Sequence, residues 1–468
     1  MHANELSKSS ASKGWFWLTK KFGDKSLIDS RFILRRLAAA HINHRRIAAS
    51  ALAIGVLTIV AKLFVAGREI AIAWRFGVSP TVDAYQLAVT IVTWVPMMLV
   101  SAGSIVLVPR FVALHGRSTE RHRFIAELNG TLLWLSLALA ITIWIIAPVG
   151  AGLLGTKARA HTIDLTVRIC RMMSPVVWAV VWAGYLSARL QARERFAYTI
   201  TEAVPALGIA AAVVAPLLTT PEVRLGWATS AGYVAQVAVL ALMVRRADGV
   251  GQVAFTHNAP EWSPLYRDLG VMVLGQVVIT LALPIDQAFA ARIGAGAVAT
   301  LGYASRIVVL VTGLGAVVFT RALLPVFSRE IVGGDPEAAA RHARQWSFLL
   351  AGSGIALFAL IWLLAPWAVS LFFQRGAFTA SDADAVAHVL RFGMVQVPFY
   401  LGGLALVQWI AAKGSYSSLL WISCGGLVTK VLLSLLLVRP LGLAGLMLAT
   451  AAMYGFSFAC QYWVSLRQ

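Results

Sequence analysis

Long apolar stretches recur along the chain and are separated by short polar segments. Twelve of them have the length of a membrane-spanning helix, which needs about 20 mostly apolar residues. They lie at roughly 47–75, 83–108, 128–153, 166–187, 197–218, 226–244, 269–291, 298–324, 346–373, 386–411, 415–438 and 442–466. Because a helix satisfies its own backbone hydrogen bonds inside a bilayer, this pattern predicts an all-α polytopic membrane protein.

The polar segments predict the organisation of the chain. The longest connection divides the twelve spans into two sets of six. We therefore expect a basic tail over 1–46, a six-helix bundle over 47–246, a linker over 247–268 and a second six-helix bundle over 269–468. Lys and Arg are concentrated in the tail and in alternate connections, which places both termini in the cytoplasm by the positive-inside rule.

The two halves look like copies of each other. Three segments recur with shifts of 217, 216 and 220 residues: 67–77 in 284–294, 107–111 in 323–327, and 191–193 in 411–413. An even number of spans per copy gives both copies the same orientation, so we expect two pseudo-symmetric bundles. Parallel repeats of this kind build alternating-access transporters, with the substrate near the bilayer midplane.

Composition supports a membrane environment. The chain is 59% hydrophobic and 13% charged, whereas a soluble chain carries about 25% charged residues. The net charge of +20 suits cytoplasmic loops beside anionic lipid headgroups. With no nucleic-acid module visible, we expect membrane lipids as partners and no nucleic acid. Cys170, Cys424 and Cys460 are scattered through apolar stretches, so neither a disulfide framework nor a zinc site is expected.

Charged residues inside the spans are the candidate functional groups. A charge at membrane depth is unfavourable by about 2.5–3.5 kcal/mol, so such residues usually face a wet cavity or a partner. The first span holds Lys62, Arg68 and Glu69, Asp83 opens the second, and Arg306 lies in the eighth. Arginine binds phosphate bidentately. We therefore expect a cationic cavity between the halves that binds a polyanionic headgroup.

A second set of charged residues lies in the other half. Asp286 and Arg292 are near the end of the seventh span, and Lys430 is in the eleventh. They are candidates for the cavity or for ion coupling, although an Arg near a span end also reaches the headgroups by snorkelling. No metal or cofactor is expected, and coupling to the membrane potential, Na⁺ or H⁺ stays open. Thr379 and Asp382 read as a helix capping box.

Several motifs together resemble the MviN/MurJ family, which flips the polyprenyl-diphosphate-linked peptidoglycan precursor lipid II. This family belongs to the multidrug/oligosaccharidyl-lipid/polysaccharide exporter superfamily. The similar segments are 66–77 with 83–85, 303–306 with 323–325, 375–382, and 440–446. The resemblance covers about residues 47–465. It implies substrate-binding roles for the residues at the family's cavity positions: Lys62, Arg68, Glu69, Asp83 and Arg306.

The chain also departs from the family pattern. The lipid II flippases carry a Lys, an Arg pair and a Glu-Gly in the middle of the second span. The corresponding positions here hold Thr90, Pro96, Met97, Ser101 and Ala102. The family's two final spans have no counterpart, and the basic N-terminal tail is extra. The resemblance therefore implies either lipid II or an exopolysaccharide or capsule repeat unit on the same lipid carrier.

These observations favour a flippase in a bacterial cytoplasmic (inner) membrane, with a lipid-linked pyrophosphate glycan as its substrate. The glycan-synthesis machinery is a candidate partner, and no enzymatic activity is expected. An ion-coupled small-molecule exporter of the same superfamily is the first alternative, in which acids rather than arginines are essential. A membrane glycan polymerase or ligase is the alternative of another class, and a scaffold with a partner-binding tail is a further one.

Overall fold

The computed structural model describes residues 42–114, 118–154, 160–214, 220–249, 251–332 and 335–467, which are mostly helical and contain no strand. The basic tail expected over 1–46 lies almost entirely outside these residues. The chain divides into two compact units, Met1–Val56 and Leu57–Gln468. The account below concerns the second unit and the helices within it.

The first half contains seven α-helices and one 3₁₀ helix. Their bounds are α3 (Ile42–Phe76), α4 (Pro80–Ala113), α5 (Ser118–Leu154), α6 (Ala160–Met172), α7 (Ser174–Ala192), η1 (Phe196–Glu202), α8 (Ala203–Val214) and α9 (Pro221–Asp248). Proline stands at the first position of α4 and α9, where its missing N–H is not needed. The fourth expected span is broken, because α6 and α7 meet at an angle of 49°.

The second half contains seven further helices. Their bounds are α10 (Trp262–Thr280), α11 (Ala282–Ile293), α12 (Ala297–Val332), α13 (Pro336–Phe373), α14 (Ala380–Met394), α15 (Val397–Ala412) and α16 (Tyr416–Leu466). The expected capping box is confirmed at the start of α14. The backbone N–H of Thr379 donates to Asp382 at 2.9 Å, and that of Asp382 donates to the Thr379 hydroxyl at 3.2 Å.

The last helix, α16, covers both the eleventh and the twelfth expected spans. Its backbone is non-helical at Gly442, with φ 56° and ψ −131°, a left-handed conformation that glycine adopts readily. The two arms fold back on each other: a Cβ added to Gly426 would lie 2.9 Å from the hydroxyl oxygen of Ser457. Small residues therefore allow the two arms to pack closely.

The helix bounds repeat with the spacing expected from the sequence. Helix α3 ends at Phe76 and α11 at Ile293, while α4 begins at Pro80 and α12 at Ala297, so both pairs are 217 residues apart. The ends of α7 and α15 are 220 residues apart. The prediction of two pseudo-symmetric halves is thus confirmed at the level of individual helix ends.

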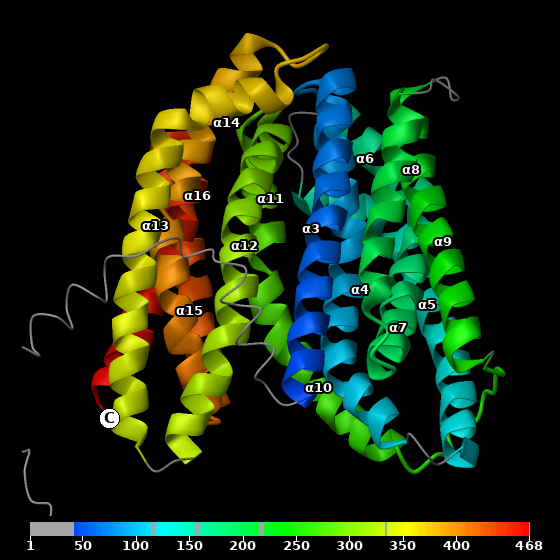
Figure 1. The fold of residues 1–468 in the computed structure, drawn as a ribbon. Coiled ribbons are helices and arrows are strands. Elements are labelled where there is room, and N and C mark those ends of the chain that lie inside the picture. The colour runs from blue at the N-terminus through cyan, green and yellow to red at the C-terminus, as the bar shows by residue number, and fades with distance from the viewer. Residues whose placement is uncertain are drawn as a thin grey trace, which may run out of the picture. The chain divides into compact units, whose positions relative to one another are not determined.

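The helices of each half pack mainly against one another. In the first half α4 packs on α6 and α7, and α9 on α7 and α8; in the second, α15 packs on α12, α13 and α16. Figure 1 shows the two groups side by side, one from blue to green and the other from yellow-green to red. Contacts between the groups run through α4 with α12 and α10, and through α11 with α4 and α5.

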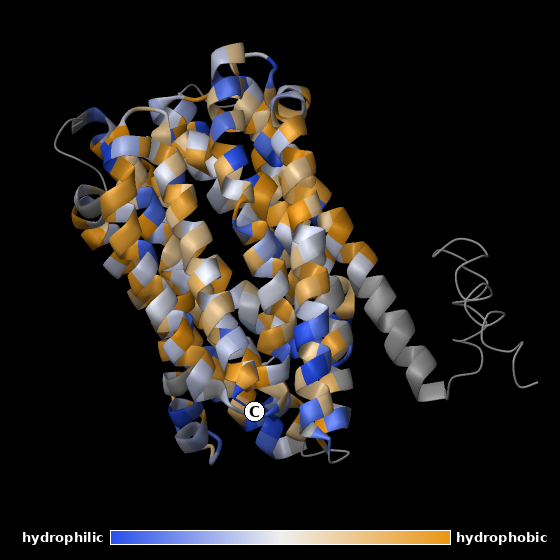
Figure 2. Cartoon of the chain, turned by 90° about the vertical axis from the view of Figure 1, so that its left-hand side faces the viewer, coloured by the Kyte–Doolittle hydropathy of each residue, from blue (hydrophilic) through white to orange (hydrophobic). Residues whose placement is uncertain are grey.

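The outer faces of the helices are apolar. Leu363 and Trp421 are 75% and 76% exposed, which a lipid solvent tolerates and water does not. Figure 2 shows hydrophobic residues along the length of the helices and hydrophilic ones gathered toward their two ends. Within the described ranges, eight helices are long and apolar enough to cross a membrane, or nine with the bent pair. The chain is an integral membrane protein.

Candidate functional site

Two arginine side chains, one from each half of the molecule, meet at the carboxylate of Glu69. The Glu69 carboxylate on α3 accepts a hydrogen bond from Nε of Arg68 at 2.9 Å and another from its Nη2. It also accepts a hydrogen bond from Nη1 of Arg306 on α12. The Glu69 side chain is 3% exposed, that of Arg68 18% and that of Arg306 33%. This cluster joins α3 to α12, and so the first half to the second.

The cluster lies well inside the ends of its two helices. Glu69 lies seven residues before the end of α3, and Arg306 lies nine residues after the start of α12. At 1.5 Å per residue, both lie roughly 10–14 Å from these helix ends. The hydrocarbon core is about 30 Å thick. A charge this far inside a membrane-spanning helix needs a partner or water.

Asp83 fastens the start of α4 to the start of α12, near the cluster. This carboxylate at the start of α4 is 3% exposed and accepts from the backbone N–H of Ala299 at 2.7 Å and from that of Gly296. It therefore caps the first turn of α12 and interacts favourably with the helix dipole. The predicted substrate-binding role of Asp83 stays a prediction, and in this state the residue supports α12.

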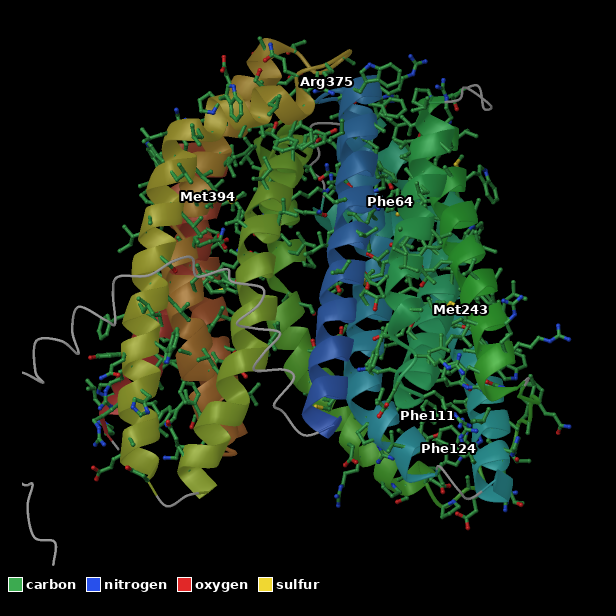
Figure 3. The ribbon with its side chains drawn as sticks, in the orientation of Figure 1. Phe64, Phe111, Phe124, Met243, Arg375 and Met394 are labelled. Carbon is green, nitrogen blue, oxygen red and sulfur yellow. The ribbon has the colours of Figure 1, made fainter. Side chains whose placement is uncertain are left out.

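The loop after α13 adds a further contact at the same end. The backbone N–H of Ala377 donates to the carbonyl of Trp74 at 2.8 Å. A Cβ on Gly77 would lie 2.3 Å from the Ala377 oxygen, and Arg375 lies beside the end of α3 (Figure 3). These contacts close the two halves against each other at this end of the molecule.

The other predicted site residues lie apart from the cluster. Lys62 is half-exposed and pairs with Glu202 at 3.4 Å rather than with Glu69. Asp286 on α11 pairs with Lys430 on α16, which forms a second and separate charged site. Arg292 is exposed in the last turn of α11. Of the eight predicted residues, the structure therefore brings three into one cluster and two into another.

Polar residues of α4 and α9 lie near the cluster, and their role was not predicted from the sequence. Tyr85 is 2% exposed, and its hydroxyl shares a hydrogen bond of 3.1 Å with Thr229. The hydroxyl groups of Tyr85 and Tyr233 are close enough to Arg68 to interact with it electrostatically. Gln86 lies against Gly302, one turn before Arg306, since a Cβ there would be 1.9 Å from its amide oxygen. The available signal was the pair of polar residues Tyr85 and Gln86, which begins two positions after Asp83 in an apolar span.

The arrangement is suited to binding an anion. Two guanidinium groups share one carboxylate, so the cluster carries one net positive charge. Arg68 uses Nε and Nη2, and Arg306 uses Nη1; each guanidinium has five N–H donors in a planar fork. The donors left over match the oxygens of a phosphate. Among the described residues, no group of three or more His, Cys, Asp or Glu side chains is placed to hold a metal ion.

A second buried acid fastens the segment between the halves. Glu127 on α5 is 1% exposed and accepts from the backbone N–H of Ala259 at 3.0 Å and from Nε1 of Trp262 at 2.7 Å. The Thr256 hydroxyl and the backbone N–H of Asn258 also donate to it. Phe124, near the opposite end of the molecule from Arg375 (Figure 3), packs on Trp262. The start of α10 is therefore held by the first half.

Comparisons with known proteins agree with this architecture. The family model described as lipid II flippase MurJ matches residues 72–468. A probable lipid II flippase MurJ of Rhizobium tropici is 27% identical over 440 residues, covering 88% of this chain and 79% of the relative. A lipid II flippase MurJ of Burkholderia cenocepacia is 26% identical over 427 residues, covering 85% of this chain and 80% of the relative.

Solved structures show the same fold. A lipid II flippase MurJ in an inward closed conformation matches with a TM-score of 0.77 at 18% identity, covering 89% of this chain and 88% of that one. An inward-facing multidrug resistance MATE family transporter of the MOP superfamily matches with a TM-score of 0.67 at 16% identity, covering 90% of this chain and 97% of that one. At these identities the likeness establishes the fold alone.

Proposed function

The chain belongs to the lipid II flippase MurJ family, and from this premise we propose that it translocates a polyprenyl-diphosphate-linked glycan precursor across the cytoplasmic membrane by alternating access. The cargo is lipid II or an exopolysaccharide or capsule repeat unit on the same carrier. The curated relatives are named as flippases, which are transporters rather than enzymes.

The observation that carries this proposal is the cluster of Arg68, Glu69 and Arg306 between the halves. A diphosphate bears at least two negative charges and several oxygens in tetrahedral groups. Two guanidinium forks from different halves match it, because arginine pairs with phosphate through two parallel hydrogen bonds. The glycan follows the diphosphate through the protein while the polyprenyl tail stays in the bilayer.

Glu69 acts in this scheme as the resident counter-ion of the two arginines. Without cargo, its carboxylate holds both guanidinium groups in place and offsets the unfavourable burial of their charge. The diphosphate replaces it at one or both arginines, which loosens the link between α3 and α12. Release of the diphosphate on the other side lets Glu69 pair again and restores that link.

The orientation follows from the distribution of basic residues. We place both termini in the cytoplasm, since Lys and Arg are concentrated on that side of the expected spans. The end closed by Asp83 and by the pairing of Ala377 with Trp74 is then the external one. The described state is closed toward the outside, which is the state expected before cargo enters from the cytoplasm.

The main alternative is an ion-coupled exporter of small molecules. The likeness to MATE transporters fits it at the level of fold. An exporter of cations needs acidic groups free to bind its cargo, whereas Glu69 is shared by two arginines and Asp83 binds two backbone N–H groups. The charge of the cluster therefore favours an anionic cargo over a cationic drug.

A transport assay with purified protein tests the proposal. The protein is reconstituted into vesicles with fluorescent lipid II, and a membrane-impermeant quencher reports the fraction in the outer leaflet over time. Arg68→Glu and Arg306→Glu are expected to abolish translocation without preventing membrane insertion. The control Arg341→Glu changes an exposed arginine that pairs with Glu337 at 3.7 Å, outside the cluster, and keeps the wild-type rate. Normal translocation by both site variants would reject the assignment.

A further inference from the structure

A fully buried lysine lies in the second half, away from the cluster of Arg68, Glu69 and Arg306. Lys430 on α16 is 0% exposed. Both carboxylate oxygens of Asp286 on α11 lie 2.9 Å from its Nζ. The same Nζ donates to the hydroxyl of Thr450, which in turn donates to the carbonyl of Leu446 at 3.1 Å. The ammonium group, on the first arm of α16, therefore contacts oxygen atoms from α11 and from the second arm of α16.

Oxygen atoms of this kind are typical ligands of a hard cation. Alkali and alkaline-earth ions are bound in proteins by carboxylate, hydroxyl and carbonyl oxygens. Asp286 and Thr450 supply such oxygens, and the ammonium of Lys430 stands among them. Lys430 makes no ion pair with a second carboxylate in the part of the chain that the structure describes. One positive and one negative charge are therefore already balanced at this site.

A soluble cation cannot share the site with a charged lysine. Adding Na⁺ would leave one uncompensated positive charge in a buried place, which is strongly unfavourable. We propose that the Lys430 ammonium is a resident cation that replaces a dissociable one, so that the protein needs no Na⁺ at this site. Removing that ammonium converts the oxygens of Asp286 and Thr450 into a Na⁺ site.

The site is placed where a bound cation controls helix packing. Asp286 is on α11, which packs against α16 and α12 in the second half and against α4 and α5 in the first. Lys430 and Thr450 are on opposite arms of α16, before and after the kink at Gly442. The ammonium therefore joins α11 to both arms. Without a cation, the buried Asp286 carboxylate loses its counter-ion and α11 loses this attachment to α16.

Thermal unfolding of purified protein tests the inference without using transport. The wild type and Lys430→Ser are compared in NaCl and in N-methylglucamine chloride of equal ionic strength. Shortening the side chain leaves space for an ion and adds an oxygen. We expect the wild type to unfold at the same temperature in both salts. Lys430→Ser should unfold at a lower temperature in N-methylglucamine and recover as Na⁺ is added, as for any ligand that binds only the folded state.

Two controls sharpen this experiment. The double variant Lys430→Ser with Asp286→Asn removes the carboxylate and should show no effect of Na⁺. Lys413→Ser changes a lysine that lies over the Trp409 ring at 5.2 Å and should behave as the wild type in both salts. Lys430→Asn, which retains an oxygen ligand, is the second variant at the site and should give the same Na⁺ response as Lys430→Ser.

The results decide the inference in either direction. A higher unfolding temperature of the wild type in Na⁺, or a folded Lys430→Ser that is indifferent to Na⁺, would overturn it. Failure of both Lys430 variants to fold in Na⁺ would overturn it as well, because Na⁺ should replace the missing charge. A second experiment, in which Na⁺ restores lipid II translocation by Lys430→Ser, rests on the proposed function. If translocation is not restored while the unfolding temperature responds to Na⁺ as expected, the result counts against the proposed function only.

Discussion

Because Glu69 is shared by two arginines, we predict that two substitutions in this cluster change the affinity for a diphosphate in opposite directions. Glu69→Gln removes the negative charge that competes with a diphosphate, whereas Arg306→Gln removes a positive charge that binds it. Both changes remove the same ion pair between α3 and α12. A purely structural cluster would therefore respond to them alike. A diphosphate site would respond with tighter binding in the first case and weaker binding in the second.

The magnitude follows from the distances and exposures of these groups. A diphosphate held by both arginines would lie about 5 Å from the Glu69 carboxylate, where two unit charges interact by roughly 3 kcal/mol at an effective dielectric constant of 20. The Arg306 side chain is 33% exposed, so solvent screening reduces this value. We expect the binding free energy of the diphosphate to change by about 1–2 kcal/mol, which corresponds to roughly 5- to 30-fold in affinity. The affinity should rise in Glu69→Gln and fall in Arg306→Gln.

The assay is equilibrium binding of fluorescent undecaprenyl diphosphate to protein in lipid nanodiscs at two ionic strengths. Glu202→Gln is the control, because it removes a half-exposed carboxylate paired with Lys62 at 3.4 Å and lies outside the cluster. Its affinity should equal that of the wild type. The reasoning is refuted if Glu69→Gln weakens binding to the same degree as Arg306→Gln.

Three further predictions concern the contacts that position the site. Asp83→Ala removes the cap of α12 and should lower the free energy of unfolding by about 1–2 kcal/mol, measured by chemical denaturation. Glu127→Ala removes the acceptor that holds the segment before α10, so chymotrypsin should cleave faster after Phe255, which is 60% exposed. Gly302→Val should lower the unfolding temperature more than Gly313→Val on the same helix. A Cβ at Gly302 meets the Gln86 amide, and one at Gly313 meets nothing within 4 Å.

Each of these predictions has a contrary result. Unchanged stability of Asp83→Ala would show that α12 needs no cap from α4. Cleavage of Glu127→Ala at the wild-type rate would show that other contacts hold the segment. Equal unfolding temperatures for the two glycine variants would show that Gln86 moves aside without loss of packing between α4 and α12.

The membrane fold follows from the sequence because its signals are local. Each apolar stretch satisfies its own backbone as a helix. The described parts of all twelve expected spans accordingly fall on helices, with the last two joined as α16. The repeat is also visible in the sequence, because the segments that end at Gly77 and Gly294 align. In the structure each of these glycines directly follows the end of a helix. The break between α6 and α7 was not predicted, because an apolar run has the same hydropathy whether straight or bent by 49°.

Charged pairs in the site were less predictable than the spans. The sequence indicated Arg68, Glu69 and Arg306 individually, but their pairing joins residues 237 positions apart and depends on how the halves pack. Lys62 was expected in the same cavity, and the structure pairs it with Glu202 instead. The partner of Glu127 is a loop, and loop conformation leaves no periodic pattern in the sequence.

The central claim is that this protein moves a polyprenyl-diphosphate-linked glycan by way of the cluster of Arg68, Glu69 and Arg306. The most direct measurement is the rate at which purified protein carries fluorescent lipid II across the bilayer of sealed vesicles, compared with Arg306→Glu at matched reconstitution. We predict translocation by the wild type that the variant loses and that excess unlabelled undecaprenyl diphosphate inhibits. Equal rates in wild-type, variant and protein-free vesicles, with correct insertion confirmed, would contradict lipid II as the cargo. Equal rates well above those of protein-free vesicles would contradict the role of the cluster.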